Sequence, residues 1–515
     1  MAHVTRGDWR TGLHPAQRHA ALPPVRAVRF DSRAVTPGDL FVCVRGERAD
    51  GHDFAAHAVA AGAVALVAER GRAPQLEALG VPVVRVADAR RALSAIAAAH
   101  EGVPAERLTV IGVTGTDGKS TTAFLALAAL EACGLRAGLL STIESRVAGQ
   151  RVPNPTRLTT QEAPFVQARL ADFVDAGCTH AVVEATSHGL ALHRLDDCAF
   201  DVAVLTNFGS DHIDFHGSQE AYRAAKARLF ALLDAPTTKR RPRRAVLNAD
   251  DPAWRSFAAA TRAPAFTYGL DAADADLRVD AIEGRADGSR FTAHAGGRRV
   301  AAAVALPGRF NVANAAAALA VCAALGLDLN AAAAGIAACA GVPGRMERIG
   351  GAPFEVVVDY AHTPDALAQV LGMLRALVPG RLIVVFGCAG ERARERRSGM
   401  GRVAAQLADM TLLTDEDPRS EPPDAILGEI AAAMDTAGAR AGVDYEIVRP
   451  RGAAIARAMA LAAPGDLVLI AGKGHETSIE WADHAEPWDD RDAARDAIAA
   501  RFGARAAQGA QHGES

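Results

Sequence analysis

Residues 112–122 bring together residue types that bind phosphate; the sequence there reads Gly-Val-Thr-Gly-Thr-Asp-Gly-Lys-Ser-Thr-Thr. The apolar run 108–113 leads into this segment and the helix-like run 123–132 follows it. Small residues let backbone N–H groups approach anionic oxygens, and the start of a helix adds partial positive charge. We expect Lys119 to reach the outer phosphates and the Ser120 hydroxyl to bind Mg²⁺. The segment therefore predicts an ATP site.

The loop is shorter than the strict P-loop pattern, because Val113 stands where that pattern has its first glycine. What remains is Gly-Thr-Asp-Gly-Lys-Ser at 115–120. An ordinary turn between a strand and a helix is the alternative interpretation. The strand–loop–helix context and the Lys-Ser-Thr ending favour the phosphate loop. The predicted nucleotide contacts in the loop are Gly115, Thr116, Asp117, Gly118, Lys119, Ser120 and Thr121.

Glu184 ends a second apolar run, 181–184, and opens the segment Glu-Ala-Thr-Ser-His. A carboxylate at the end of a strand beside a phosphate loop is typical of a Mg²⁺ anchor in ATP sites. The alternative is structural, with Glu184 acting as a helix N-cap or in a salt bridge.

Two acids and two histidines lie within six residues at 211–216, after the apolar run 202–206. His212 is a candidate metal ligand, although Mg²⁺ prefers oxygen. Zinc is disfavoured because no cysteine or third histidine lies at zinc spacing. Lys226 follows in an amphipathic helix with Leu229 and Phe230 on its apolar side. Taken alone, such a lysine is expected to be a surface residue.

The elements around these residues predict an α/β protein with several domains. Short apolar runs at 40–44, 63–67 and 81–86 alternate with Ala-rich helical stretches, and segments at 271–305 are expected to form edge hairpins. Strands expected at 355–359, 381–387, 410–414 and 467–471 alternate with helices, which is typical of a Rossmann-like fold. Ligands bind at the carboxyl ends of such strands. The predicted domains are 1–104, 105–343 and 344–503, followed by a flexible tail at 504–515.

Composition restricts the class of protein. At 515 residues the chain is expected to hold about three domains. Half of the residues are apolar and the formal net charge is −4, which disfavours intrinsic disorder, nucleic-acid binding and membrane insertion. The seven cysteines contain no Cys-x-x-Cys pair and suit a reducing compartment. We therefore expect a soluble cytoplasmic protein, monomeric and with small-molecule partners.

Several motifs together resemble the Mur ligase family, over about residues 25–500. They are the phosphate loop, Glu184-Ala-Thr-Ser-His188, the segment 206–217, Tyr222-Arg-Ala-Ala-Lys226, 308–314, Gly344-Arg-Met-Glu347 and 358–367, with Asp31-Ser-Arg33, Leu158-Thr-Thr160, 387–392 and 472–476 in the flanking domains. The resemblance implies a three-domain architecture with a UDP-muramyl substrate domain, a central P-loop ATPase-like parallel sheet and a Rossmann-like domain for an amino acid. It also implies that ATP phosphorylates the terminal carboxylate of UDP-N-acetylmuramoyl-L-alanyl-D-glutamate, and that an amine then attacks the acyl phosphate, a step of peptidoglycan precursor synthesis.

The same resemblance assigns site residues. Two Mg²⁺ ions would be held by Ser120, Glu184, His212 and Lys226, with Lys226 carbamylated by CO₂, and the catalytic set would be Lys119, Glu184, His212 and Lys226. The ATP side would also include Asn311, Arg345, Asp359 and His362. The UDP-muramyl end would meet Ser32, Thr159, Thr160, Ser187 and Arg194. The amino acid would meet Arg392, Glu416, Asp417, Pro418, Arg419, Gly472 and Glu476. The resemblance names no general base for the attack by the amine.

The chain departs from the family pattern at three places. Asp117 stands where an Asn is usual, Leu192 replaces a polar residue, and Asp417 replaces the Asn of the Asp-Asn-Pro-Arg motif typical of diaminopimelate-adding members. Arg419 of that motif remains, and with Arg392 it could clamp a distal carboxylate, so we favour meso-diaminopimelate over lysine, ornithine or another amine. The alternatives are a related amide ligase of the folylpolyglutamate type and a nucleotide-binding module that no longer ligates.

Overall fold

The computed structural model describes residues 8–12, 22–46, 49–154, 156, 158–285 and 287–503. The chain divides into two compact units, which are described separately. The first contains most described residues up to 338. The second contains residues from 339 onward, together with the short pieces 283–290 and 304–311. The predicted tail at 504–515 lies outside the described residues.

The first unit begins with a four-stranded parallel sheet of order β1-β2-β3-β4. In β2, Leu40 and Val42 pack in one core with α3, whereas Phe41 packs in another with α1. This two-sided burial explains why the strand reads as a continuous apolar run. The elements are η1 (Trp9–Gly12), β1 (Val28–Arg29), η3 (Ser32–Ala34), β2 (Leu40–Val42), η4 (Gly51–Phe54), α1 (Ala55–Ala60), β3 (Ala65–Glu69), α2 (Ala73–Leu76), η5 (Glu77–Leu79), β4 (Val83–Val86), α3 (Ala89–His100) and η6 (Pro104–Arg107).

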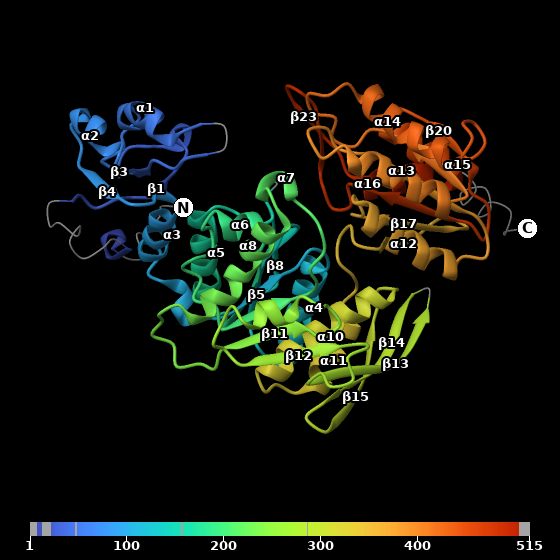
Figure 1. Ribbon diagram of the computed structural model, residues 1–515, viewed down its shortest axis with the longest axis horizontal. Coiled ribbons are helices and arrows are strands. Elements are labelled where there is room, and N and C mark those ends of the chain that lie inside the picture. The colour runs from blue at the N-terminus through green and yellow to red at the C-terminus, as the bar shows by residue number, and fades with distance from the viewer. Residues whose placement is uncertain are drawn as a thin grey trace, which may run out of the picture. The chain divides into compact units, whose positions relative to one another are not determined.

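An eleven-stranded sheet follows, with the order β15-β14-β13-β12-β11-β10-β5-β9-β6-β7-β8 (Figure 1). Neighbouring strands are parallel from β13 through β12, β11, β10, β5 and β9 to β6. The pairs β6–β7 and β7–β8 are antiparallel. The strands are β5 (Thr109–Thr114), β6 (Ala137–Leu140), β7 (Glu144–Val147), β8 (Gln150–Pro153), β9 (His180–Glu184), β10 (Val202–Leu205), β11 (Arg244–Asn248), β12 (Ala265–Gly269), β13 (Leu277–Arg285), β14 (Gly288–Ala295) and β15 (Arg298–Val304).

Helices accompany this sheet, and one buried core joins α5 and α8 to β5, β9, β10 and β11. Phe173 of α5 and Leu229 and Phe230 of α8 belong to that core. The helices are α4 (Lys119–Ala132), α5 (Ala163–Asp175), α6 (Ser187–Ala191), α7 (Ile213–His216), α8 (Gln219–Ala231), η7 (Leu232–Asp234), α9 (Trp254–Ala258), α10 (Arg309–Ala324) and α11 (Leu329–Ala338).

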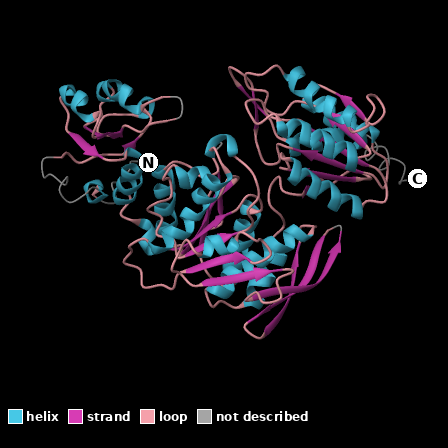
Figure 2. Ribbon diagram, in the orientation of Figure 1, coloured by secondary structure: helices cyan, strands magenta, loops and turns pink. Residues whose placement is uncertain are grey.

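The second unit has a six-stranded sheet of order β16-β17-β21-β18-β19-β20, parallel except for β16, and a hairpin of β22 and β23. Val356, Val358, Val468 and Ile470 pack in one core with α15 and α16. Figure 2 shows helices lying against these strands. The elements are β16 (Glu347–Arg348), β17 (Glu355–Asp359), α12 (Pro364–Leu377), β18 (Leu382–Phe386), α13 (Glu395–Leu407), β19 (Met410–Leu413), α14 (Pro423–Thr436), β20 (Tyr445–Ile447), α15 (Arg451–Leu461), β21 (Leu467–Ala471), β22 (Ser478–Glu480), β23 (Ala485–Pro487), α16 (Asp490–Ile498) and η8 (Ala499–Gly503).

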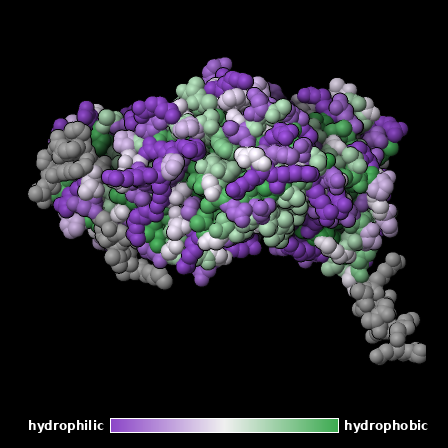
Figure 3. Space-filling model, turned by 90° about the horizontal axis from the view of Figure 1, so that it is seen from below, coloured by the Kyte–Doolittle hydropathy of each residue, from purple (hydrophilic) through white to green (hydrophobic). Residues whose placement is uncertain are grey.

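The predicted α/β class with parallel sheets is confirmed, and strands lie at each of the apolar runs where they were expected. The edge hairpins expected at 271–305 correspond to β13, β14 and β15 at one end of the central sheet. All seven cysteines are free thiols and five of them are buried. On the face drawn in Figure 3, hydrophilic and hydrophobic residues are interspersed.

Candidate active site

The phosphate loop lies where β5 ends and α4 begins. Gly115 has φ +153° and Gly118 has φ +78°, both in the region that favours glycine. A Cβ atom on Gly115 would lie 1.8 Å from the Thr206 hydroxyl oxygen, and one on Gly118 would lie 2.2 Å from Asn314 Oδ1. Because Gly118 is the N-cap of α4 and has no side chain, the first amides of the helix are left for another partner. The loop therefore has the conformation and the helix terminus that bind an anion.

Lys119 lies against this loop. Its Nζ donates hydrogen bonds to the carbonyl oxygens of Gly115, at 3.1 Å, and Thr116, at 2.7 Å. The charge of the ammonium group is thereby kept beside the loop, and its contact with the outer phosphates stays a prediction.

Asp117 is held by its backbone. Its N–H donates to Asn207 Oδ1 at 2.9 Å, and its carbonyl accepts from Thr206 Oγ1 at 2.6 Å and Asn207 Nδ2 at 3.1 Å. The residue is exposed. The carboxylate that distinguishes this chain at 117 is therefore not needed to shape the loop.

Glu184 lies beside the loop because β9 pairs with β5, with Glu184 opposite Val113. It is buried, and its Oε1 accepts from Ser120 Oγ at 2.9 Å. Its Oε2 accepts from the Thr142 N–H at 2.9 Å and the Thr142 hydroxyl at 3.0 Å. The N-cap alternative is wrong, because Thr186 caps α6. A carboxylate next to a hydroxyl is a set of hard oxygen donors that suits Mg²⁺.

Lys226 is buried, so the expectation of a surface lysine is wrong. Its Nζ donates to the Gly115 carbonyl at 2.5 Å and lies 4.6 Å from the centre of the Tyr222 ring. Burial, with the nearby charge of Lys119, holds the pKa of Lys226 well below its usual value. Helical periodicity counts this lysine as polar, whereas the fold directs it at the phosphate loop.

Three histidines and Tyr222 form a ring cluster beside Lys226. The His188 ring centre lies 4.7 Å from that of His212 and 5.5 Å from that of His216, and Tyr222 lies 5.3 Å from His216. Burial and the charges of His212 and His216 lower the pKa of His188 to about 3, so its imidazole is neutral at pH 7. The structure thus brings predicted ligand His212 near Lys226, and it adds His188, His216 and Tyr222, which were not assigned roles.

In the described part of the chain, no group of three or more His, Cys, Asp or Glu side chains is arranged to hold a metal ion. The predicted Mg²⁺ set differs in kind, since it also uses the Ser120 hydroxyl and a modified lysine. The roles of its four residues stay predictions.

The remaining residues predicted for the ATP side all belong to the second unit. Arg345 stacks 4.4 Å over the Tyr360 ring, and His362 Nδ1 is 2.7 Å from the Tyr360 carbonyl. Asp359 accepts hydrogen bonds from the N–H groups of Met346 and Ala361. Asn311 donates to the Pro307 carbonyl at 2.8 Å. Their approach to the nucleotide stays a prediction.

The residues predicted for the UDP-muramyl substrate fall in two places in the first unit. Ser32 lines a cavity of about 640 Å³, together with Arg90 and Glu162. Arg194 pairs with Glu162 at 2.7 Å, and its Nη1 donates to the Thr160 carbonyl at 2.9 Å. Glu162, two residues after the Leu-Thr-Thr motif, was missed by sequence reasoning and links the cavity to Arg194.

Other members of that set are held near Glu184. The Thr160 hydroxyl donates to the Glu184 carbonyl at 3.0 Å, and Ser187 begins α6 and is buried. Thr159 is half-buried beside them in sequence.

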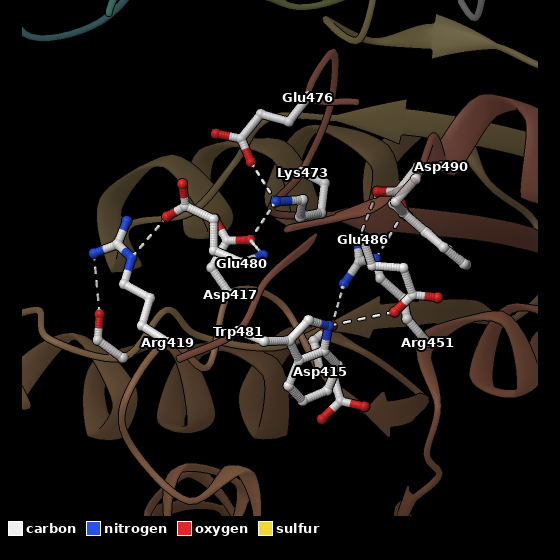
Figure 4. Close-up of polar contacts among 12 residues, drawn as sticks. Asp415, Asp417, Arg419, Arg451, Lys473, Glu476, Glu480, Trp481, Glu486 and Asp490 are labelled. Carbon is white, nitrogen blue, oxygen red and sulfur yellow. Dashed lines mark hydrogen bonds and ion pairs between the residues drawn. The ribbon is translucent and has the colours of Figure 1, made fainter. Parts of the chain in front are cut away.

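In the second unit, three of the residues predicted for the amino acid, Asp417, Arg419 and Glu476, take part in ion pairs (Figure 4). Arg419 Nε lies 3.0 Å from Glu480 Oε2, and Lys473 Nζ lies 2.8 Å from Asp417 Oδ1 and 2.6 Å from Glu476 Oε2. Lys473 and Glu480 were not predicted. Each lies more than fifty residues from its partner Asp417 or Arg419, which a local motif cannot show.

Backbone contacts hold this region together. Arg419 Nη1 donates to the Gly390 carbonyl at 3.2 Å, and a Cβ atom on Gly390 would lie 2.1 Å from the Pro418 oxygen. Arg392, two residues after Gly390, is exposed, so a joint clamp by both arginines stays a prediction.

Glu416 lies against Gly472, where a Cβ atom would be 2.9 Å from Glu416 Oε2. Burial raises the pKa of Glu416 to about 7. The backbone at Gly472 has φ +106°, which favours glycine, and the Glu416 carboxyl packs against it.

Three family models match the chain in order: "Mur ligase family, catalytic domain" at residues 24–101, "Mur ligase middle domain" at 113–322 and "Mur ligase, glutamate ligase domain" at 344–474. A UDP-N-acetylmuramyl-tripeptide synthetase from Roseiflexus sp. (strain RS-1) is 45% identical over 94% of this chain and 96% of its own. A UDP-N-acetylmuramoyl-L-alanyl-D-glutamate–2,6-diaminopimelate ligase from Streptomyces coelicolor is 41% identical over 92% of each.

Among solved structures, another UDP-N-acetylmuramoyl-L-alanyl-D-glutamate–2,6-diaminopimelate ligase is 32% identical, with a TM-score of 0.63 over 93% of this chain and 96% of its own. No helix among the described residues is long and apolar enough to cross a membrane.

Proposed function

The chain belongs to the Mur ligase family, and from that premise we propose that it is an ATP-dependent ligase joining meso-2,6-diaminopimelate to UDP-N-acetylmuramoyl-L-alanyl-D-glutamate. The observation that carries the proposal is the arrangement of Lys119, Ser120 and Glu184 around a glycine loop. Relatives whose names state diaminopimelate and UDP-N-acetylmuramoyl-L-alanyl-D-glutamate, and which align over more than 90% of this chain, support the choice of substrates.

The phosphate loop binds ATP and fixes its reactive end. The amides of α4 and the ammonium group of Lys119 stabilise negative charge on the phosphoryl group that is transferred to the substrate carboxylate. The amine of the acceptor then attacks the carbonyl carbon of the acyl phosphate. The new C–N bond forms, the amine loses a proton, and the C–O bond to the oxygen that bridges to phosphorus breaks, so inorganic phosphate leaves with the former carboxylate oxygen. An unactivated carboxylate is a poor electrophile, so this activation is what ATP supplies.

Mg²⁺ fits the oxygen donors of this site. Ser120 and Glu184 would hold one ion, and His212 and Lys226 would contribute to a second. When bound, the ions neutralise charge on the transferring phosphoryl group. Thr142 keeps the Glu184 carboxylate oriented toward Ser120 through two hydrogen bonds.

Carbamylation of Lys226 is part of the proposal. The neutral amine would attack CO₂, forming an N–C bond and losing a proton, and would so become an oxygen donor. What supports this is the low pKa of Lys226, because only the neutral amine reacts with CO₂. A buried ammonium group beside Lys119 is unfavourable, whereas a carbamate there would be attracted to it.

The substrate-binding roles that the family resemblance implies are also part of the proposal. The cavity at Ser32 would take the uridine and muramyl end, with Thr159, Thr160, Ser187 and Arg194 along the peptide, while the region of Arg419 would take the amino acid. The matched ranges 24–101, 113–322 and 344–474 support domains at 1–104, 105–343 and 344–503. We further propose a monomer working in the cytoplasm, where ATP and UDP-linked precursors are available.

Phosphate release by the purified protein tests the proposal. The reaction contains ATP, Mg²⁺ and UDP-N-acetylmuramoyl-L-alanyl-D-glutamate, with meso-diaminopimelate, L-lysine or L-ornithine as the acceptor. We expect release that requires diaminopimelate. Phosphate release only with lysine or ornithine would show that diaminopimelate is not the acceptor. ATP binding without phosphate release in the presence of any of these three amino acids would contradict the ligase activity.

A further inference from the structure

Arg419 is already paired in the acceptor region of the second unit. Its Nε lies 3.0 Å from Glu480 Oε2, and its backbone N–H donates to the Glu480 carbonyl at 3.0 Å (Figure 4). The side chains are 22% and 30% exposed, so a ligand can reach both charges. A ligand therefore meets the Arg419 guanidinium and the Glu480 carboxylate side by side.

Asp417 is not the carboxylate that pairs with Arg419, although it lies only two residues away in the sequence. Its Oδ1 is 2.8 Å from the buried ammonium group of Lys473 and accepts the Glu480 N–H at 2.8 Å. This carboxylate is thus held inward against Lys473, which also pairs with Glu476. The carboxylate in contact with Arg419 is that of Glu480, and it is partly exposed.

Glu480 is fixed by the hairpin of β22 and β23. The hairpin pairs Glu480 with Ala485 in antiparallel register, and Trp481 forms a bridge with Arg419. The cation and anion are thereby kept side by side by backbone contacts as well as by their charges. Such a pair complements a group that itself carries adjacent opposite charges.

We propose that Glu480 is a specificity-determining residue for the acceptor, binding the ammonium group of its distal end while Arg419 binds the distal carboxylate. The inference rests on the proposed function, in which the acceptor is diaminopimelate. The distal end of this molecule is zwitterionic, so it exchanges the Arg419–Glu480 pair for two new charge-assisted contacts. Lysine carries only the ammonium group and would leave the Arg419 guanidinium without a carboxylate in exchange.

The test compares Glu480→Gln with the wild type on two acceptors. One is meso-diaminopimelate, and the other is L-2-aminopimelate, which keeps the distal carboxylate but lacks the distal amine. The matched control is Glu486→Gln, which removes the same charge from the other strand of the hairpin, where Glu486 accepts a hydrogen bond from Trp481. The KM of each acceptor is measured by phosphate release, or its inhibition constant where it is not turned over.

We expect Glu480→Gln to raise the KM for diaminopimelate about tenfold, because a hydrogen bond between charged groups is lost. The constant for 2-aminopimelate should not rise, because its carboxylate no longer has to displace Glu480 from Arg419, and no constant of Glu486→Gln should change. Thermal unfolding of both variants checks the fold, and Glu480→Ala repeats the comparison if the glutamine variant is unstable.

Two results would overturn the role of Glu480 alone. Equal increases for both acceptors would mean that Glu480 only orients Arg419, and no change for either would mean that it does not meet the acceptor. In both cases the wild type still uses diaminopimelate. A wild type that releases phosphate only with a different acceptor would instead refute the proposed function, and this inference with it.

Discussion

Substitution of Glu184 by Gln tests the Mg²⁺ site with little change in shape. The carboxylate receives three hydrogen bonds, one on Oε1 from Ser120 and two on Oε2 from Thr142. A glutamine can keep its oxygen toward Thr142 and place its NH₂ group toward Ser120, whose hydroxyl can accept. All three hydrogen bonds can therefore be kept, and only the one with Ser120 changes its direction.

The loss of charge assistance in these contacts is partly offset, because a buried carboxylate also loses its hydration on folding. We therefore expect the free energy of unfolding to change by only about 1 kcal/mol. Binding of Mg²⁺ should change far more, since removing a partner of a ligand already costs about 10–100-fold in metal affinity. For a direct ligand, the Mg²⁺ concentration that gives half-maximal phosphate release should rise by at least about 100-fold.

The assay is a Mg²⁺ titration of phosphate release at saturating ATP, with thermal unfolding as the check on the fold. A suitable control is Glu144→Gln, which neutralises another buried carboxylate that pairs with Arg146 and Arg151. This control should lose stability and keep its Mg²⁺ dependence. An unchanged Mg²⁺ midpoint in a folded Glu184→Gln variant would refute the assignment.

Three further predictions address other parts of the chain. Lys226→Ala should abolish ligation, and a small added carboxylic acid should restore part of it; phosphate release measures the activity with and without the acid. Near-normal activity without the acid would contradict the carbamate. Arg419→Ala should raise the acceptor KM at least tenfold and leave the ATP KM within about twofold; steady-state kinetics with each substrate varied would show equal changes if Arg419 does not bind the acceptor. Burial and the charge of Arg241 lower the pKa of His180 to about 4, below its usual 6.5. The unfolded chain therefore binds the extra proton first, so stability is lost as the pH falls from about 6.5 toward 4; the melting temperature of His180→Gln should fall less over this range than that of the wild type, and parallel curves would exclude His180.

Much of the fold could be predicted because its strands are buried on both faces. Apolar runs such as 181–184 and 202–206 are conspicuous, and polar residues follow them at the carboxyl edge of the sheet. Strands β11, β12 and β20 were not predicted. β12 begins with an exposed residue and two half-buried ones, and only one of the three residues of β20 is buried, so these two patterns do not stand out from loops. β11 is as long and as buried as β9, and its apolar run was simply missed.

The site was less predictable where long-range contacts decide it. The spacing Tyr-x-x-x-Lys places Lys226 one helical turn from Tyr222, but it cannot show that the lysine lies under the phosphate loop. That burial comes from α8 packing against the sheet through Leu229 and Phe230, which carries Lys226 inward. The family resemblance, and not the local pattern, pointed to this lysine.

Asp417 shows how a long-range contact changes the interpretation of a motif. From the sequence, an acid in place of the usual Asn adds negative charge near the site expected for the zwitterionic end of the acceptor. In the fold, Asp417 is buried against Lys473, and the motif's Arg419 points to Glu480 on a hairpin sixty-one residues away. Because Asp417 is buried and paired with Lys473, we expect the departure at 417 not to favour lysine over diaminopimelate. We therefore expect the selection between these acceptors to depend on the Arg419–Glu480 pair.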